Sequence, residues 1–262
     1  MVPPMEATDT PKLISATTVW SLFATVAILA AGYVSSRQLL PTSASNKTRF
    51  LFVWHATDAL IHFLLEGSYL WNCFFSRSTL VAAGLTGSEY LPHNVFFLGD
   101  KEHVYGASYG TSLTSALWRE YARADKRWGG SDLTVISLEL LTVFVAGPLA
   151  VWVCYCLKNK RSDSSFWMIV LATGELYGGW MTFVPVRRYC YCCETSQADF
   201  TQEWLSGSSN LDTSNWMFTW LYLFFFNTLW VWIPLWILYD CYGTIVGAVN
   251  VKNKKECTRK EA

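Results

Sequence analysis

Residues 13–36 read LISATTVWSLFATVAILAAGYVSS and contain no charged side chain. A helix of this length and apolarity can cross about 30 Å of hydrocarbon, so the stretch predicts a retained membrane span. Residues 213–239 form a second uncharged stretch, which includes WMFTWLYLFFFNTLWVWIPLWILY. Pro234 would kink this helix, and neighbouring helices in a membrane bundle can accommodate such a kink. These two stretches indicate a membrane protein.

Three further apolar stretches carry acids but no Lys or Arg, over residues 50–76, 134–157 and 164–186. Their other positions are apolar on all faces, which favours membrane spans with functional interruptions over amphipathic helices of a soluble protein. We therefore expect an all-α fold, a polytopic membrane protein built as a five-transmembrane-helix bundle. The five expected spans are 14–36, 50–75, 134–157, 165–186 and 214–240, which together make one domain over residues 14–240.

Basic side chains gather in the segments between and after these spans. Lys and Arg cluster in the loops at 37–49 and 158–163 and in the tail at 241–262, which five spans would place on one side. By the positive-inside rule that side is the cytoplasm, so the N-terminal tail at 1–13 would be lumenal. A long insertion at 76–116 would also be lumenal, either as a solvated loop or as a lid on a cavity.

The composition excludes several classes of protein. Lys plus Arg and Asp plus Glu each number 20, and only 15% of residues are charged. A nucleic-acid partner would require a basic excess, so none is expected. Arg259 and Lys260 near the end of the chain resemble a retrieval signal, which predicts the endoplasmic reticulum membrane as the location.

Ionisable groups inside a membrane are costly, so each needs a partner or a function. Asp58, His62 and Glu66 are spaced i, i+4, i+8 and share one helix face. A histidine there can hydrogen-bond a carboxylate with one ring nitrogen and present the other to a substrate. A purely structural His–carboxylate pair is the alternative, but a further acid on another span favours a function.

Polar residues on two other spans extend this set. Glu139 is followed by Thr142 one turn later, and Asn227 and Trp230 share a face of the last span. Two carboxyls in different surroundings allow one to act as acid and the other as base. A tryptophan ring beside a site that forms a cation can stabilise that cation, although packing is its more common role.

This inventory supports two kinds of chemistry. One is proton transfer to and from an apolar substrate through a carbocation, and the other is capture of a lipophilic amine by a buried carboxylate. No nucleophile, phosphate loop or nucleotide fingerprint is present, so neither covalent catalysis nor a cofactor is expected. Cys190, Cys192 and Cys193 lack an accompanying His, so we expect no metal site there, and a lumenal disulfide is possible.

Several blocks of this sequence, in order, resemble the emopamil-binding protein family, the sterol Δ8–Δ7 isomerases of the EXPERA superfamily. They are IHFLLEG at 61–67, LWREYARADKRW at 117–128, D-x-T-V-x-x-x-E at 132–139, GPLAVW at 147–152, GELYG at 174–178 and Y-x-x-x-x-N-T-L-W at 222–230. The resemblance implies a five-helix bundle in the endoplasmic reticulum, usually a homodimer, with a sterol cavity and no cofactor. It also implies migration of a ring double bond by protonation, carbocation formation and deprotonation, and binding of lipophilic amines as inhibitors.

The resemblance also implies roles for individual residues. His62 and Glu66 would deliver a proton, with Glu139 as the second acid–base group oriented by Thr142. Asn227 would hydrogen-bond within this network, and Trp230 would face the cation. The positions expected to contact the substrate are Asp58, Tyr121, Trp128, Tyr177 and Tyr222.

Some positions depart from the family pattern. Trp128 stands where the family has a tyrosine, and the 76–116 insertion is longer than the family's loop, so the substrate is expected to differ more than the chemistry. The alternative is a non-catalytic protein of the same fold, similar to the sigma-two receptor, that holds sterols or cationic amphiphiles. A transporter would favour discontinuous helices and internal repeats, which the sequence lacks.

Overall fold

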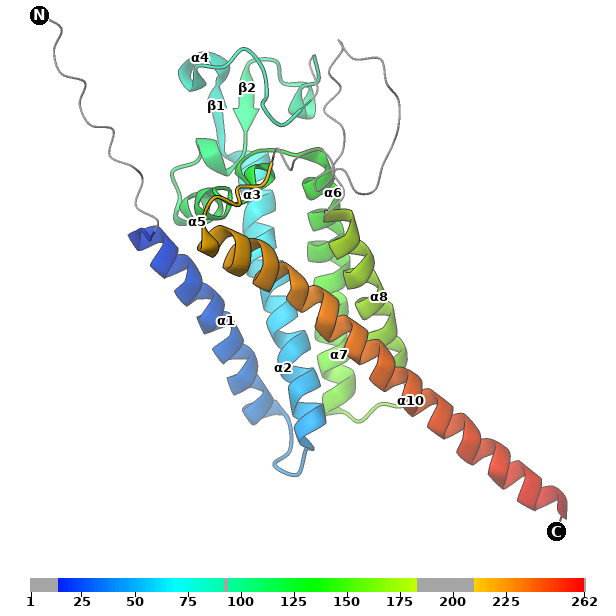
Figure 1. The fold of residues 1–262 in the computed structure, drawn as a ribbon. Helices are drawn as coiled ribbons and strands as arrows, with labels where there is room; N and C mark the ends of the chain where they lie inside the picture. Colours follow the sequence, from blue (N-terminus) through cyan, green and yellow to red (C-terminus); the bar gives the residue numbers. More distant parts are fainter. Residues whose placement is uncertain (1–13, 92–93, 183–209, 262) are drawn as a thin grey trace, which may run out of the picture.

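The structure is a computed structural model that describes residues 14–91, 94–182 and 210–261. Long helices dominate these ranges, as the sequence predicts (Figure 1). The main elements are α1 (Ala16–Leu39), α2 (Asn46–Leu60), η1 (Ile61–Glu66), α3 (Gly67–Phe75), α5 (Leu113–Tyr121), α6 (Leu133–Leu141), η5 (Thr142–Ala146), α7 (Gly147–Lys158), α8 (Ser164–Thr182), η6 (Met217–Phe225) and α10 (Phe226–Glu261).

Three helical segments among the described residues are long and apolar enough to cross a membrane: Ala16–Leu39, Leu133–Lys158 and Met217–Lys260. The other two expected spans are also helical where the structure describes them, over residues 46–75 and 164–182. The acids in both segments, and the histidines in 46–75, lower their apolar character.

Helix α1 shows how the outer surface of the bundle differs from its interior. Ser15 caps its first turn by accepting a hydrogen bond from the Thr18 backbone, and the uncharged sequence continues the helix to Leu39. Trp20, Phe23 and Val26 are each more than half exposed on its outer face. Large apolar side chains exposed in this way are what a lipid-facing helix presents.

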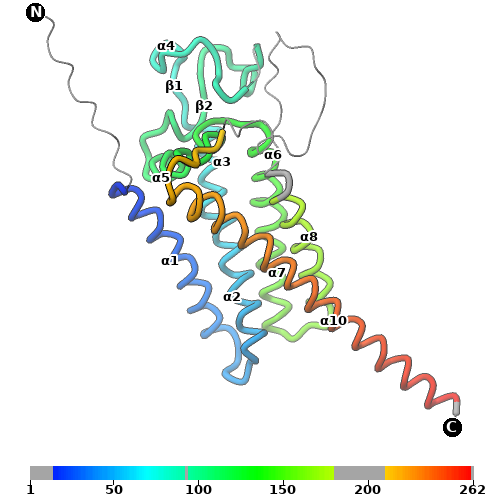
Figure 2. Tube along the Cα trace, viewed as in Figure 1, coloured from blue at the N-terminus to red at the C-terminus, as the bar shows by residue number. Residues whose placement is uncertain are grey.

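Helix α10 crosses the bundle obliquely and packs along α8 (Figure 2). It is continuous to Glu261, so the basic tail expected at 241–262 is helical through that residue and projects beyond the other helices (Figure 1). The turns that join α1 to α2 and α7 to α8 lie at the same end of the bundle. The three basic segments therefore share one end.

The core between these helices consists of Leu51, Trp54, Ala59, Ala150, Val153, Met168, Leu171, Ala172, Ile237 and Cys241.

Three of the long helices contain π-helical segments, in which a backbone N–H bonds five residues back. The Gly67 N–H reaches the His62 carbonyl at the end of η1, and the Gly147 N–H reaches the Thr142 carbonyl at the end of η5. The third segment, η6, precedes α10. Such segments are rare and frequently mark functional sites. Here they coincide with the polar residues that the sequence singles out.

The 76–116 insertion corrects the all-α expectation. It contains a two-stranded antiparallel sheet of β1 (Arg77–Thr79) and β2 (His103–Tyr105), with Ser78 opposite Val104. Short helical turns surround the strands: α4 (Leu80–Ala83), η2 (Phe97–Gly99) and η3 (Ala107–Tyr109). The described fold is therefore mostly helical with one small sheet, at the end of the bundle opposite the basic segments (Figure 1).

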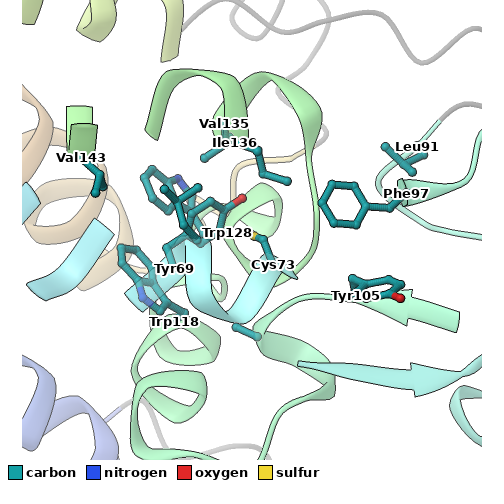
Figure 3. Close-up of a cluster of buried hydrophobic side chains, with 12 residues drawn as sticks. Tyr69, Cys73, Leu91, Phe97, Tyr105, Trp118, Trp128, Val135, Ile136 and Val143 are labelled. Carbon is teal, nitrogen blue, oxygen red and sulfur yellow. The ribbon is translucent and has the colours of Figure 1, made fainter. Parts of the chain in front are cut away.

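The insertion is packed rather than solvated. Leu91, Phe97 and Tyr105 join a buried cluster with Tyr69 of α3 and with Trp128 (Figure 3). Trp128 belongs to a short turn, η4 (Lys126–Gly129), that follows α5. The insertion thus packs against the aromatic side chains of α3, α5 and η4. The sequence did not predict this contact.

Asp100 organises the polar side of this insertion. Its carboxylate accepts hydrogen bonds from the Tyr105 hydroxyl at 2.7 Å, from the Glu102 backbone at 2.9 Å and from His103. The Tyr105 hydroxyl contributes most to holding the pKa of Asp100 well below its usual range, followed by the Glu102 N–H and His103. Asp100 therefore links strand β2 to the turn before it.

Candidate active site

A cavity of about 910 Å³ opens within the helical bundle. Residues from α1, η1, α5, α6, η5, α8, η6 and α10 line it, and most of them are apolar. Among the described residues that line it there is no Lys or Arg, whereas four are glutamates: Glu66, Glu120, Glu139 and Glu175. Such a cavity falls in the size range of small-molecule sites and suits an apolar ligand that acquires positive charge.

The π-helical segment η1 places His62 and Glu66 together on the cavity wall. His62 Nδ1 lies 2.5 Å from Glu66 Oε2, and the imidazole is almost fully buried. A hydrogen bond this short to a carboxyl is typical of a charge-assisted contact. The i, i+4 spacing predicted that the two side chains would meet, and they do.

Glu139 faces the same cavity from α6. Its Oε2 accepts a hydrogen bond from Thr142 Oγ1 at 2.7 Å, and the carboxyl is 3% exposed. Thr142 also donates to the Glu139 backbone carbonyl, at the start of the π-helical segment η5. This hydroxyl therefore fixes the orientation of the buried carboxyl.

Asn227 links the last helix to the end of α5 at the cavity wall. Its Nδ2 donates to the backbone carbonyls of Tyr222 and Leu223, at 3.1 and 2.8 Å, and lies 3.3 Å from the Tyr121 hydroxyl. Both carbonyls belong to the π-helical segment η6, so this amide adds two side-chain hydrogen bonds to its irregular backbone. Asn227 thus stabilises the irregular backbone that carries Tyr222.

Trp230 lines the cavity one turn after Asn227. Its indole Nε1 donates to Asp58 Oδ1 at 2.9 Å. His62 Nε2 lies 3.3 Å from the same oxygen, but outside hydrogen-bonding geometry. One buried carboxylate therefore sits behind both the tryptophan and the histidine of the site.

An aromatic group forms the wall near α5. The rings of Trp118 and Trp128 are stacked, with centroids 4.9 Å apart, and Tyr121 meets Trp128 edge-on at 5.5 Å. Tyr222 lies 5.8 Å from Tyr121 between ring centroids, and its hydroxyl donates to Glu120 at 3.2 Å. Trp128 thus fills its position through ring packing.

The structure brings together ten of the eleven residues that the sequence singled out: His62, Glu66, Tyr121, Trp128, Glu139, Thr142, Tyr177, Tyr222, Asn227 and Trp230 all line the cavity. Asp58 differs, because it lies behind His62 and Trp230 and does not line the cavity. The position of Asp58 fits a supporting role rather than the substrate contact that we expected. Cys190, Cys192 and Cys193 lie outside the described residues.

Two cavity residues were not assigned from the sequence. Glu175 on α8 is an acid in an expected span, yet no neighbour in the sequence indicated its partner. Glu120 accepts a hydrogen bond from Thr18 of α1 at 2.7 Å and an ion pair from Arg123 at 3.1 Å. The 102 positions between Thr18 and Glu120 explain why sequence alone did not pair them. The insertion at 76–116 contributes no described residue to the cavity lining, which argues against the lid that the sequence allowed.

Comparisons with known proteins place this site in context. Residues 113–241 match the family model described as EXPERA (EXPanded EBP superfamily). The chain is 24% identical over 207 residues to the 3-beta-hydroxysteroid-Delta(8),Delta(7)-isomerase of Cavia porcellus, which covers 79% of this chain and 69% of the relative.

Two plant relatives carry other names. A protoglabretal synthase of Ailanthus altissima is 25% identical, over 67% of each chain. An isomeliandiol synthase of Melia azedarach is 24% identical, over 83% of this chain and 80% of the relative. The named relatives are thus isomerases and synthases of low identity to this chain. Together with the family match and the blocks that line the cavity, they support the emopamil-binding protein family of the EXPERA superfamily for this chain.

Proposed function

We propose that this protein moves a ring double bond of a sterol or related polycyclic isoprenoid, in the manner of a Δ8–Δ7 isomerase. The observation that carries the proposal is the convergence of two hydrogen-bonded carboxyls, Glu66 and Glu139, on one apolar cavity of about 910 Å³. A cavity of this kind can exclude water from a carbocation, which water would otherwise trap.

The proposed reaction is a proton addition followed by a proton loss. A carboxyl or imidazolium of the His62–Glu66 couple, or Glu139, donates a proton to one alkene carbon, and the neighbouring carbon becomes cationic. A second group of the set then takes a proton from the carbon on the other side, so that the double bond has moved and no atom is gained or lost. The contact between Thr142 and Glu139 supports distinct surroundings for the two carboxyls.

The remaining site residues hold this arrangement. Trp230, fixed by Asp58, supplies an aromatic ring at the cavity wall that can stabilise a cation. Asn227 holds the backbone of η6 and contacts the Tyr121 hydroxyl. Tyr177, Tyr222 and Trp128 are the proposed substrate contacts, and no cofactor enters the reaction.

We further propose that the protein spans the endoplasmic reticulum membrane five times as a homodimer, with a lumenal N-terminus and a cytoplasmic C-terminus. The gathering of the three basic segments at one end of the bundle supports this orientation. A lysine introduced into the loop at 40–45 and another introduced into the insertion at 76–116 can each be tested with an amine reagent that does not cross the membrane. We expect the reagent to label the first lysine only from the cytoplasmic side and the second only from the lumenal side.

The second candidate is a binding protein that holds a sterol or cationic amphiphile without turnover. Four glutamates and no Lys or Arg among the described lining residues favour cation binding, which both functions share. Lipophilic tertiary amines should therefore bind under either proposal. Turnover, rather than amine binding, separates the two.

Expression in a host that lacks the Δ8–Δ7 isomerase, followed by sterol profiling in heavy water, tests the proposal. We expect Δ8 sterol to convert, with deuterium taken up in the product. Because two relatives are named for protoglabretal and isomeliandiol, the substrates of those synthases belong in the same panel. Glu89→Gln in the exposed part of the insertion is the matched control for Glu66→Gln and Glu139→Gln. Conversion of no member of the panel, with retained amine binding, would support the binding protein instead.

A further inference from the structure

A second group of ionisable side chains lies beside the proposed catalytic residues. His55 and Asp58 come from α2 and Glu175 comes from α8, and one ligand atom of each lies within 4.8 Å of the other two. Their exposed fractions are 0%, 1% and 8%, so all three are more than nine-tenths buried. The proposed reaction uses neither His55 nor Glu175.

The polar atoms of this group are unusual because most have no partner. Neither ring nitrogen of His55, neither carboxyl oxygen of Glu175, nor Oδ2 of Asp58 has a hydrogen-bond partner among the described residues. Buried polar atoms are nearly always satisfied in folded proteins, and leaving a carboxylate and an imidazole unpaired costs several kcal/mol. Three side chains from two helices bring such atoms within 4.8 Å of one another, where a single shared ligand would satisfy them.

The structure assigns this point as a binding site for a divalent transition-metal ion of the zinc class, held by His55, Asp58 and Glu175. Imidazole nitrogen and carboxylate oxygen are the ligands that zinc accepts beside thiolate, and three protein ligands leave one position open. Two carboxylates neutralise a doubly charged ion, which satisfies the requirement that charges buried in an apolar bundle be paired.

The surroundings of the ligands support this assignment. Trp230 holds Asp58 Oδ1, while Oδ2 has no described hydrogen-bond partner and is available to an ion, and such outer contacts normally orient metal-binding carboxylates. Glu175 lines the cavity, which provides a route for the ion. Zinc–ligand bonds of about 2.0–2.2 Å would draw the three groups closer than the present arrangement and connect α2 to α8.

The sequence did not reveal this site, because the three ligands do not form a local motif. His55 and Asp58 are three positions apart on one helix, and the third ligand comes from a helix more than 100 positions later. The inference is independent of the isomerase proposal, since metal content can be measured whether or not the protein turns over a sterol.

The test is metal analysis of the full-length protein, purified in detergent after exposure to zinc and then to metal-free buffer. We expect roughly one zinc ion per chain in the wild type. Glu175→Gln and His55→Leu should each retain less than about a tenth of that amount, because loss of even an outer-shell partner typically lowers metal affinity about 10–100-fold and these variants lose a ligand itself. Asp58 is left unchanged in this series because it also holds Trp230.

Glu139→Gln is the matched control, since it removes a buried carboxyl from the same cavity but outside the metal group. It should keep the wild-type zinc content. Cobalt substitution of the wild type gives a second readout that does not depend on variant folding: a visible absorption band should appear and be abolished by zinc. A wild type that retains no zinc and shows no cobalt band would overturn the inference, as would equal zinc contents in Glu175→Gln and Glu139→Gln. Either result would leave the isomerase proposal intact.

Discussion

The indole Nε1 of Trp230 donates a hydrogen bond to Asp58 Oδ1 at 2.9 Å, across 172 positions of sequence. This contact joins the last helix to the helix that carries His62. It also converts Asp58 from a predicted substrate contact into a support for two residues of the site. Trp230 is the one described hydrogen-bond donor to this buried carboxylate. Its loss would leave the carboxylate unsatisfied, so the contact is important for stability.

Replacement of Asp58 should therefore affect stability according to what replaces it. Asp58→Ala leaves the half-buried Trp230 N–H without an acceptor, and we expect a loss of about 1–3 kcal/mol in the free energy of unfolding. Asp58→Asn keeps an acceptor oxygen and should lose less. Thermal unfolding in detergent, with and without a bound tertiary amine, measures the difference. Equal destabilisation by both substitutions would show that the hydrogen bond to Trp230 contributes little.

The Thr142 hydroxyl should matter for turnover more than for binding. Thr142→Val keeps the shape of the side chain but removes the 2.7 Å hydrogen bond to Glu139 Oε2. The loss of one such contact, worth about 1–1.5 kcal/mol, should lower kcat roughly 10-fold with little change in KM. Thr173→Val, at an exposed position of α8, is the control. An increase in KM at unchanged kcat would instead indicate that Thr142 contacts the substrate.

Removal of either cavity carboxyl should have a larger effect. Glu66→Gln and Glu139→Gln each preserve side-chain size but abolish proton transfer, and general acid–base groups typically contribute 10²–10⁴-fold to rate. We expect losses in this range for both variants, together with reduced deuterium uptake. Amine binding should weaken in the same variants because each loses a carboxylate. Wild-type rate and label uptake in both would refute the assigned roles.

Close packing of α1 against α2 should be sensitive to a single methyl group. A Cβ on Gly32 would lie 3.2 Å from the Val53 carbonyl oxygen and from the Thr57 backbone nitrogen. Small residues permit this approach of two helices, and Gly32→Ala should separate them at a cost of about 1–3 kcal/mol. Because Leu22 and Thr25 of α1 line the cavity, substrate KM should also rise.

Gly243→Ala is the matched control for Gly32→Ala. It is also helical, on α10, and a Cβ there meets nothing within 4 Å. We expect unchanged or slightly higher stability, since alanine favours a helix more than glycine does. A comparable loss from both substitutions would indicate that the contact between α1 and α2 is not the cause.

Acid should loosen the insertion at 76–116 before it affects the bundle. The hydrogen bonds from Tyr105, Glu102 and His103 lower the pKa of Asp100 in the folded state relative to the unfolded state. The stabilisation is complete above the ordinary carboxyl pKa of about 3.9 and is lost as the pH falls below it, because the unfolded state then binds the proton more readily. Hydrogen exchange of β1 and β2 should accelerate in this window, and Asp100→Asn should show faster exchange already at neutral pH.

Much of the fold and site could be predicted because the evidence was local. The charge-free stretch at 13–36 required a helix in apolar surroundings, since only a helix satisfies its own backbone there. The spacing of His62 and Glu66 placed them on one face, and the structure joins them at 2.5 Å. Both predictions depended on residues close in sequence.

Other features depended on distant parts of the chain. The strands β1 and β2 pair across more than twenty positions, and three residues each were too few for the alternation of a strand to be visible. The insertion also packs through Phe97 and Tyr105 against Tyr69 and Trp128, a contact that composition could not assign. Its packing and its absence from the described cavity lining argue against both the solvated loop and the lid that the sequence allowed.

The sequence by itself determined which residues are costly in a membrane: four acids in the interior of expected spans, Asp58, Glu66, Glu139 and Glu175, with no Lys or Arg in those spans. Only the tertiary structure decided which of them meet. It placed Glu66 and Glu139 on one cavity, and it set Asp58 behind Trp230 with Glu175 and His55 alongside. The physical reason is that helical periodicity fixes the face of a residue within its own helix, whereas the rotation and crossing of separate helices depend on packing along their whole length.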